Sequence, residues 1–107
     1  MTTEQLIQNA QEMSQSQKKD NTTLHQEILD YLHGLYVAKN ADYGNSVHDT
    51  YKKYGLTSFL VRMEDKLNRV RSLNQKGEAA VKDEKIEDTL LDLANYAILA
   101  VIELRQK

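Results

Sequence analysis

The stretch LLDLANYAILAVIEL, residues 90–104, decides the fold class of this chain. Its apolar residues follow one another almost without a gap, so a helix formed here is apolar on nearly every side. Such a helix belongs at the centre of a bundle or in the interface of an oligomer. A membrane-spanning helix needs about 20 apolar residues, and this run is shorter. Asp92 and Asn95 also interrupt it. We therefore expect a central bundle helix and no membrane partner.

Composition supports the same fold class for the whole chain. The 107 residues include no Pro, no Cys and only four Gly, which leaves few of the turn residues that a β-rich fold needs. The absence of Cys excludes disulfides and thiolate zinc sites. With 14 basic and 16 acidic residues, the chain lacks the basic excess of a duplex-binding domain. Its first 20 residues do not read as a secretory signal, so we expect a cytoplasmic protein.

Capping residues and hydrophobic spacing divide the chain into helices. We predict a first helix over residues 2–18 that Thr2 or Thr3 caps, and a second that starts at Thr22 or Thr23 and ends near Asn40. A loop follows over residues 41–46. A short helix is predicted from a cap at Ser46 through Tyr54, ending at Gly55. The next is predicted from Thr57 or Ser58 to a stop at Lys76-Gly77, and the last from a cap at Asp83 onward. Residues 1–20 form a helical or partly disordered arm, and residues 21–107 form a single domain, an all-α bundle of four or five helices.

Acidic and amide side chains share one face of the last predicted helix. Steps of four, four and three residues separate Glu84, Asp88, Asp92 and Asn95. Asp92 and Asn95 stand among apolar neighbours, where an unpaired carboxylate is costly. The stripe therefore needs a cation, either a basic side chain or a metal, and oxygen ligands suit Mg²⁺ or Mn²⁺. The alternative is ordinary acid enrichment near a helix start together with one buried salt bridge.

The preceding helix carries a second polar cluster within two turns: Arg62, Asp65, Lys66 and Arg69. Its carboxylate could complete a metal site, and its basic side chains could hold phosphate oxygens. Glu64 and Asn68 are oxygen ligands four residues apart, so the choice between Asp65 and Glu64 stays open. The alternative is a solvated face of ion pairs between neighbouring turns.

The predicted loop after the second helix combines a cation, a carboxylate, an aromatic ring and a glycine pivot, in Lys39, Asp42, Tyr43 and Gly44. Such a loop could close over a base and a phosphate, or it could simply end the helix. The three histidines, His25, His33 and His48, are isolated in sequence, and we assign them no role. Three tyrosines are expected in the core with their hydroxyl groups at the rim: Tyr51, Tyr54 and Tyr96.

Three motifs together resemble a known family. They are Lys39-x-x-Asp-Tyr-Gly44, Arg62-x-x-Asp-Lys-x-x-Arg69, and Asp83-Glu-x-x-x-Asp-Thr-Leu-Leu-Asp-Leu-Ala-Asn-Tyr-Ala97. Over roughly residues 30–105 the chain resembles the nucleotide-modification-associated domain family, which is small and often phage-encoded. That family is similar to the all-α nucleoside triphosphate pyrophosphohydrolases, which include MazG and the dimeric dUTPases. For a phage protein, the expected location is the host cytoplasm.

The resemblance implies a MazG-like bundle that assembles as a homodimer or homotetramer. It also implies an enzyme that binds Mg²⁺ or Mn²⁺ and cleaves a nucleoside triphosphate to the monophosphate and pyrophosphate. The metal ligands carried over are Asp65, Glu84, Asp88 and Asp92, with Asp65, Asp88 and Asp92 as the catalytic residues. The nucleotide would be held by Lys39, Asp42, Tyr43, Arg62, Lys66, Arg69 and Asn95. MazG-type enzymes have E-x-x-E on one helix, where this chain has Asp65 and Asn68.

Three functions therefore compete at this stage. The first is a Mg²⁺-dependent nucleotide pyrophosphohydrolase, and the second is a nucleotide-binding protein that sequesters or senses its ligand without turnover. The third is a helical interaction protein whose acids only pair with the basic residues. In each case the apolar last helix predicts self-association, with candidate contacts at Leu93, Ala97, Ala100 and Leu104.

Overall fold

The computed structural model describes residues 2–7, 18–43, 45–76 and 79–107, and for residues 41–43 and 79–81 it describes the backbone alone. Within these ranges the chain forms α-helices joined by short turns, and no strand occurs there. The all-α prediction is therefore confirmed. The chain divides into two compact units, residues 1–34 and 35–107, which we describe separately.

The first unit opens with a capped helical turn. Residues 3–7 are helical, the Gln5 N–H donates to Thr2 Oγ1 at 3.2 Å, and the Thr2 N–H donates to Gln5 Oε1 at 3.0 Å. This reciprocal pair is a capping box, which satisfies two backbone donors that the first turn leaves unpaired. The cap is thus Thr2, one of the two predicted residues. Ala10 and Met13, on the apolar stripe of the predicted first helix, lie outside the described residues.

Helix α2, Asn21–Tyr43, begins in the first unit and ends in the second. Its start is capped by Asp20, whose Oδ1 accepts a hydrogen bond from the Thr23 N–H at 2.8 Å. The prediction of a cap at Thr22 or Thr23 is therefore wrong. Aspartate is at least as good an N-cap as threonine, so the helix begins directly after Asp20, which precedes both threonines.

Two other helix boundaries differ from the prediction. Helix α2 runs to Tyr43, so residues 41–43 are helical where a loop was expected. Helix α5, Ala79–Arg105, begins four residues before Asp83, the expected cap. In both places the extra residues include alanine, the strongest helix former, and no proline stops the helix. Asp83 therefore marked a permitted start that α5 does not use.

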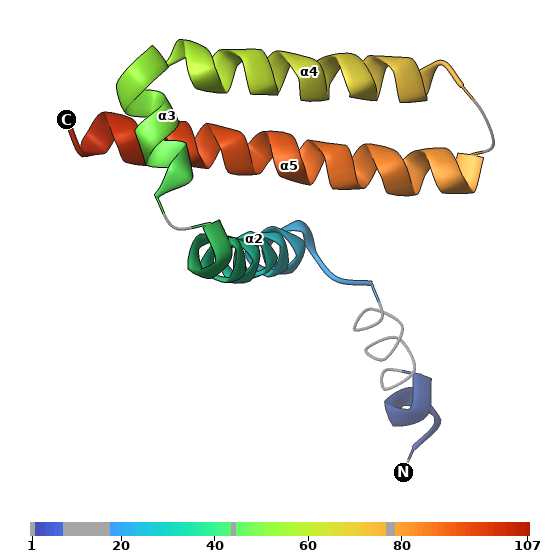
Figure 1. Ribbon diagram of the computed structural model, residues 1–107. Coiled ribbons are helices and arrows are strands. Elements are labelled where there is room, and N and C mark those ends of the chain that lie inside the picture. The colour runs from blue at the N-terminus through green and yellow to red at the C-terminus, as the bar shows by residue number, and fades with distance from the viewer. Residues whose placement is uncertain (1, 8–17, 44, 77–78) are drawn as a thin grey trace. The chain divides into compact units, whose positions relative to one another are not determined.

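The second unit contains the end of α2 followed by α3, Ser46–Tyr54, α4, Thr57–Asn74, and α5. Figure 1 shows α4 and α5 side by side along their length, with α3 across the end nearer the C-terminus. Helix α4 ends two residues before the predicted stop at Lys76. At the start of α3 the N-cap position belongs to Asn45 rather than Ser46, and no side chain caps that end.

Gly55 makes the sharp turn between α3 and α4, as the sequence predicts. Its backbone has φ 68° and ψ −157°, a region that is essentially restricted to glycine. The Gly55 N–H donates to the Tyr51 carbonyl at 2.7 Å, which closes the last turn of α3. The glycine therefore both ends α3 and sets the direction in which α4 leaves it.

The core of the second unit is small and centres on Phe59, which is only 2% exposed. The Tyr51 ring packs against it with a centroid separation of 5.9 Å and an interplanar angle of 44°. Thr89 is also buried, and its hydroxyl donates to the Lys85 carbonyl at 2.7 Å, so it carries no unsatisfied polar atom. Tyr54 is 60% exposed and its ring faces the Lys53 ammonium, so its predicted place in the core is wrong.

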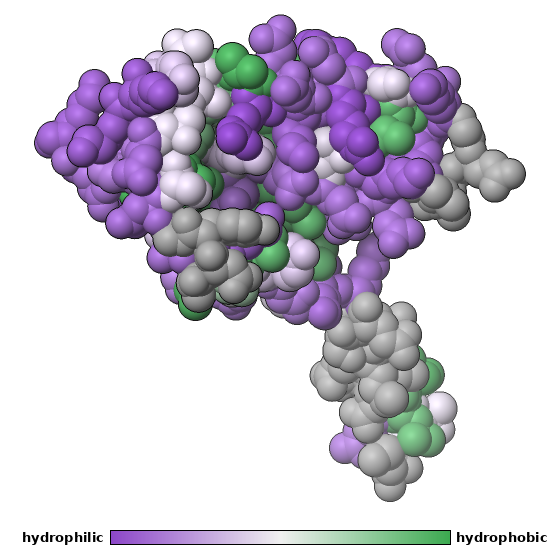
Figure 2. All heavy atoms as spheres, in the orientation of Figure 1, coloured by the Kyte–Doolittle hydropathy of each residue, from purple (hydrophilic) through white to green (hydrophobic). Residues whose placement is uncertain are grey.

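One side of α5 stays uncovered although its sequence is apolar. The exposed residues on this side are Leu90, Ile98, Val101 and Leu104, each with 41–46% of its surface open. Ala100, by contrast, is buried within the chain. Figure 2 shows hydrophobic patches between hydrophilic side chains on one face of the molecule. Among the described residues, no helix has the length and apolar character needed to cross a membrane.

Candidate functional site

A cavity of about 670 Å³ runs along one face of α5 in the second unit, and we call it the groove. This volume is within the range of small-molecule sites. The α5 residues that line it recur at steps of one and three, as one helix face requires: Asp92, Asn95, Tyr96, Leu99, Ile102 and Glu103. Gln106, directly after the end of α5, also lines it. The other walls come from the end of α2, from α3 with the turn before it, and from the first half of α4.

One end of the groove is cationic. Lys66 of α4 donates to Asp92 of α5, with 3.1 Å between Nζ and Oδ2, and both side chains are partly exposed. Arg62, one turn earlier on α4, lies over the Tyr96 ring, 5.8 Å from its centroid. In the described part of the chain no carboxylate pairs with Arg62. At this end Arg62 and Lys66 therefore outnumber the single carboxylate of Asp92. Lys39 of α2 lines the groove as well.

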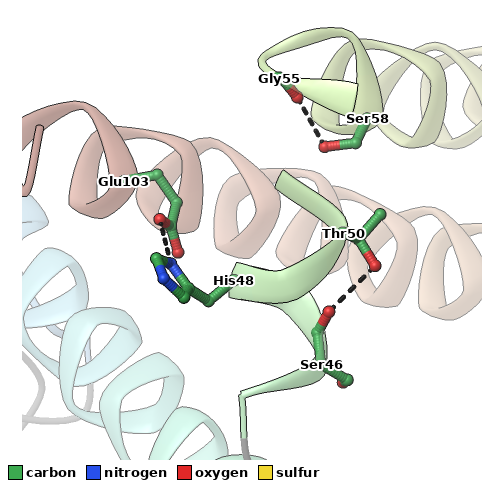
Figure 3. Close-up of polar contacts among 6 residues, drawn as sticks. All are labelled: Ser46, His48, Thr50, Gly55, Ser58 and Glu103. Carbon is green, nitrogen blue, oxygen red and sulfur yellow. Dashed lines mark hydrogen bonds and ion pairs between the residues drawn. The ribbon is translucent and has the colours of Figure 1, made fainter. Parts of the chain in front are cut away.

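The other end of the groove holds an acid–imidazole pair. His48 Nδ1 lies 2.7 Å from Glu103 Oε2, and Figure 3 shows the two side chains meeting between α3 and α5. The Glu103 side chain is 8% exposed, whereas that of His48 is 44% exposed. Two local hydrogen bonds flank this region: the Thr50 hydroxyl donates to the Ser46 carbonyl and the Ser58 hydroxyl donates to the Gly55 carbonyl.

Five of the residues predicted from sequence to form a site line the groove together: Lys39, Arg62, Lys66, Asp92 and Asn95. Four others are exposed and lie outside its lining: Asp65, Arg69, Glu84 and Asp88. Of the three predicted catalytic carboxylates, the groove thus contains Asp92 alone. Asp42 and Tyr43 belong to the helical end of α2, and their side chains lie outside the described residues.

The groove does not by itself form a metal centre. Within the described ranges, no three His, Cys, Asp or Glu side chains come close enough to hold a metal ion. The two carboxylates that line the groove, Asp92 and Glu103, are eleven residues apart on α5, which is about 16 Å along a helix axis. Each is also paired with a basic or imidazole side chain. The residues present therefore do not fit a bound Mg²⁺ without further oxygen ligands.

Sequence reasoning missed the pair of His48 and Glu103. A signal for Glu103 was present, because it is a carboxylate inside the apolar run of residues 90–104, as Asp92 is. The argument that Asp92 needs a cation applies equally to Glu103. No comparable signal marks His48, which is isolated in sequence and meets Glu103 only through the packing of α3 on the rest of the unit.

The fold and the groove define an all-α protein with a cleft that is cationic at one end and holds the His48–Glu103 pair at the other. The chain belongs to the family described as Nucleotide modification associated domain 1, whose model matches residues 39–104. The match includes all of the groove lining except Tyr36 and Gln106. It confirms the family named from the sequence motifs. No curated protein and no solved structure matches the chain.

Proposed function

We propose that the groove binds a nucleotide through its phosphate groups. The observation that carries this proposal is the placement of Arg62 and Lys66 in one cavity with a single neighbouring carboxylate, Asp92. A guanidinium group offers two parallel donors to phosphate oxygens, and an ammonium group adds a compact charge. The contact of Arg62 with the Tyr96 ring orients the guanidinium and leaves its N–H groups available at the edge.

The rest of the groove suits the remainder of a nucleotide. Beyond the cations, Asn95 supplies amide donors and acceptors, and Leu99 and Ile102 supply apolar contacts. Sites for small molecules combine an apolar lining with a few polar groups that fix the orientation of the ligand. The family description, which names nucleotide modification, supports the same class of ligand.

A second candidate function is Mg²⁺-dependent pyrophosphohydrolysis of a nucleoside triphosphate, with Asp92 at the phosphates. Water would add to the α-phosphorus and the bond from that phosphorus to the bridging α–β oxygen would break, releasing a monophosphate and pyrophosphate. Proteins commonly hold Mg²⁺ through one or two carboxylates together with substrate phosphates. Asp92 beside the phosphate-binding cations supports this candidate. The exposed acids Asp65, Glu84 and Asp88 would have to contribute in the bound or assembled state.

We also propose that the chain self-associates as a homodimer or homotetramer. The uncovered apolar side of α5 supports this proposal, because soluble proteins seldom leave a continuous apolar stripe open to water. Of the contacts predicted from sequence, Leu104 belongs to this side, whereas Ala100 is already buried within the chain. The contact surface we propose therefore consists of Leu90, Ile98, Val101 and Leu104.

A titration of the full chain with deoxynucleoside triphosphates separates these functions. Calorimetry in EDTA measures binding alone, and chromatography after addition of Mg²⁺ or Mn²⁺ measures turnover to monophosphate and pyrophosphate. Saturable binding without product supports the binding protein, and product formation supports the hydrolase. If neither is seen with any nucleotide, both are rejected in favour of an interaction protein whose acids only neutralise its cations.

A further inference from the structure

The end of the groove opposite the cations is left unexplained by phosphate binding. Glu103 is buried there, and it pairs with His48 rather than with a lysine or arginine. A buried carboxylate is costly to keep unless it has a specific partner or a task. This end also lines the cavity, so a bound ligand would reach it.

The hydrogen bond between the two side chains fixes what they present to the groove. An ionised carboxylate can only accept hydrogen bonds, so His48 Nδ1 must carry the hydrogen and donate it to Glu103. In the neutral ring Nε2 is then an acceptor. The structure gives neither Nε2 nor Glu103 Oε1 a partner among the residues it describes. With the neutral ring, this end of the groove therefore offers a ligand two acceptors, Nε2 and Oε1.

We propose that this end of the groove recognises guanine, so that the ligand of the proposed function is a guanine nucleotide. This inference rests on the proposed function. Among the common bases, guanine alone presents two adjacent donors on its pairing edge, the ring N1–H and the N2 amino group, next to the O6 acceptor. Adenine has one donor next to one acceptor, cytosine has one donor next to two acceptors, and thymine has one donor between two carbonyl oxygens. The two acceptors of His48 and Glu103 match the guanine edge.

Gln106 completes the match. It follows Glu103 by three residues, directly after the end of α5, and lines the same groove, so its side-chain amide can donate to O6. About 16 Å along the helix separate Glu103 from Asp92 at the cationic end. A ligand that reaches both ends must be elongated, with anionic oxygens at one end and a donor edge at the other. A nucleoside triphosphate has this form.

The test removes one donor from the ligand, so it needs no change in the protein. Calorimetric titrations in EDTA compare dGTP, dITP, dATP and pyrophosphate on the full chain. dITP differs from dGTP only by the missing amino group. We expect dGTP to bind roughly 5- to 150-fold more tightly than dITP, the range that one specific base contact gives. Glu103→Gln should reduce that ratio to about one, and Glu87→Gln, the same change at an exposed site on α5, should preserve it.

The outcomes distinguish this inference from the proposed function. Equal affinities for dGTP and dITP, with pyrophosphate also bound, would overturn guanine recognition and leave phosphate binding intact. Tighter binding of dATP than of dGTP would overturn it in the same way. If neither pyrophosphate nor any nucleotide binds, both proposals are rejected. Should Glu103→Gln fail to fold, the ratio of dGTP to dITP affinity in the unmodified protein still decides the question.

Discussion

Lys66 Nζ lies 3.1 Å from Asp92 Oδ2 and joins α4 to α5 at the cationic end of the groove. Since both side chains are partly exposed, the pair contributes at most about 1 kcal/mol to stability. Its larger effect is on the charge that a ligand meets. The carboxylate neutralises one cation, and a bound phosphate would compete with Asp92 for the same ammonium group.

Substitution of Asp92 separates these effects. Asp92→Asn should change the free energy of unfolding by less than about 1 kcal/mol and should strengthen pyrophosphate binding in EDTA, because Lys66 loses its competing carboxylate. If Asp92 also helps to hold Mg²⁺, the same variant should lose any Mg²⁺-dependent gain in nucleotide affinity. Urea denaturation and calorimetry measure the two quantities. An unchanged Mg²⁺ effect would contradict a metal role for Asp92.

Phe59 is the side chain on which the small core depends most. Phe59→Ala should lower the free energy of unfolding by about 3–5 kcal/mol, since it removes a fully buried ring and leaves a cavity beside Tyr51. Phe59→Leu, which fills part of that space, should cost less. Urea denaturation followed by circular dichroism measures both. Equal and small losses would show that Phe59 is not the centre of the core.

Two glycines offer a matched test of backbone conformation. A Cβ added at Gly55 or at Gly34 would meet no other atom within 4 Å, so neither substitution introduces a clash. Gly55 has φ 68°, and Gly55→Ala should cost about 1–3 kcal/mol for conformational reasons alone. Gly34 is inside α2, and Gly34→Ala should stabilise the helix by up to about 1 kcal/mol. Opposite signs in thermal unfolding are the expected result.

The stability of the first turn of α2 depends on pH through Asp20. The hydrogen bond from the Thr23 backbone N–H holds the pKa of Asp20 below its ordinary value. Because the folded pKa is lowered, the cap is fully effective above the unfolded pKa of about 3.9 and is lost as pH falls through the folded value. The protection of the Thr23 amide against exchange, measured relative to an unstructured peptide at the same pH, should therefore fall at low pH in the native chain. Asp20→Ala should show the lower protection at neutral pH as well.

Self-association is tested at the uncovered side of α5. Val101→Glu places a charge at the centre of the proposed contact surface and should convert a dimer or tetramer to the 12.3 kDa monomer. Lys85→Glu, an exposed change elsewhere on α5, should leave the assembly intact. Sedimentation equilibrium at micromolar concentration reports both. A monomeric unmodified chain would show that the apolar side needs no partner copy.

Features of the fold that depend on local sequence pattern were predicted correctly. The absence of proline and the spacing of apolar residues indicated an all-α chain, and Gly55 marked the end of α3. Sequence reasoning also recognised that Asp92 requires a cation, but it left open whether a side chain or a metal supplies it. The structure places Lys66 there, because the packing of α4 against α5 determines which residues face each other.

The features that sequence reasoning missed depend on contacts between distant segments. His48 and Glu103 are 55 residues apart, and nothing in the spacing of either one indicates the other. The carboxylates at helix spacing on α5 illustrate the same limit. Glu84, Asp88 and Asp92 share a face in sequence, yet only Asp92 is beside the groove, since the groove follows α5 toward its C-terminus.

The central claim is that Arg62 and Lys66 bind the phosphates of a nucleotide in the groove. Calorimetric titration with pyrophosphate in EDTA tests it most directly, on the unmodified chain, on Arg62→Ala and on Arg71→Ala, an exposed arginine of α4 outside the groove. A charge-assisted hydrogen bond contributes about 1.5–3 kcal/mol, so Arg62→Ala should weaken binding by at least about tenfold, while Arg71→Ala should leave it unchanged. Equal binding by all three proteins, or no binding by the unmodified chain, would contradict the claim.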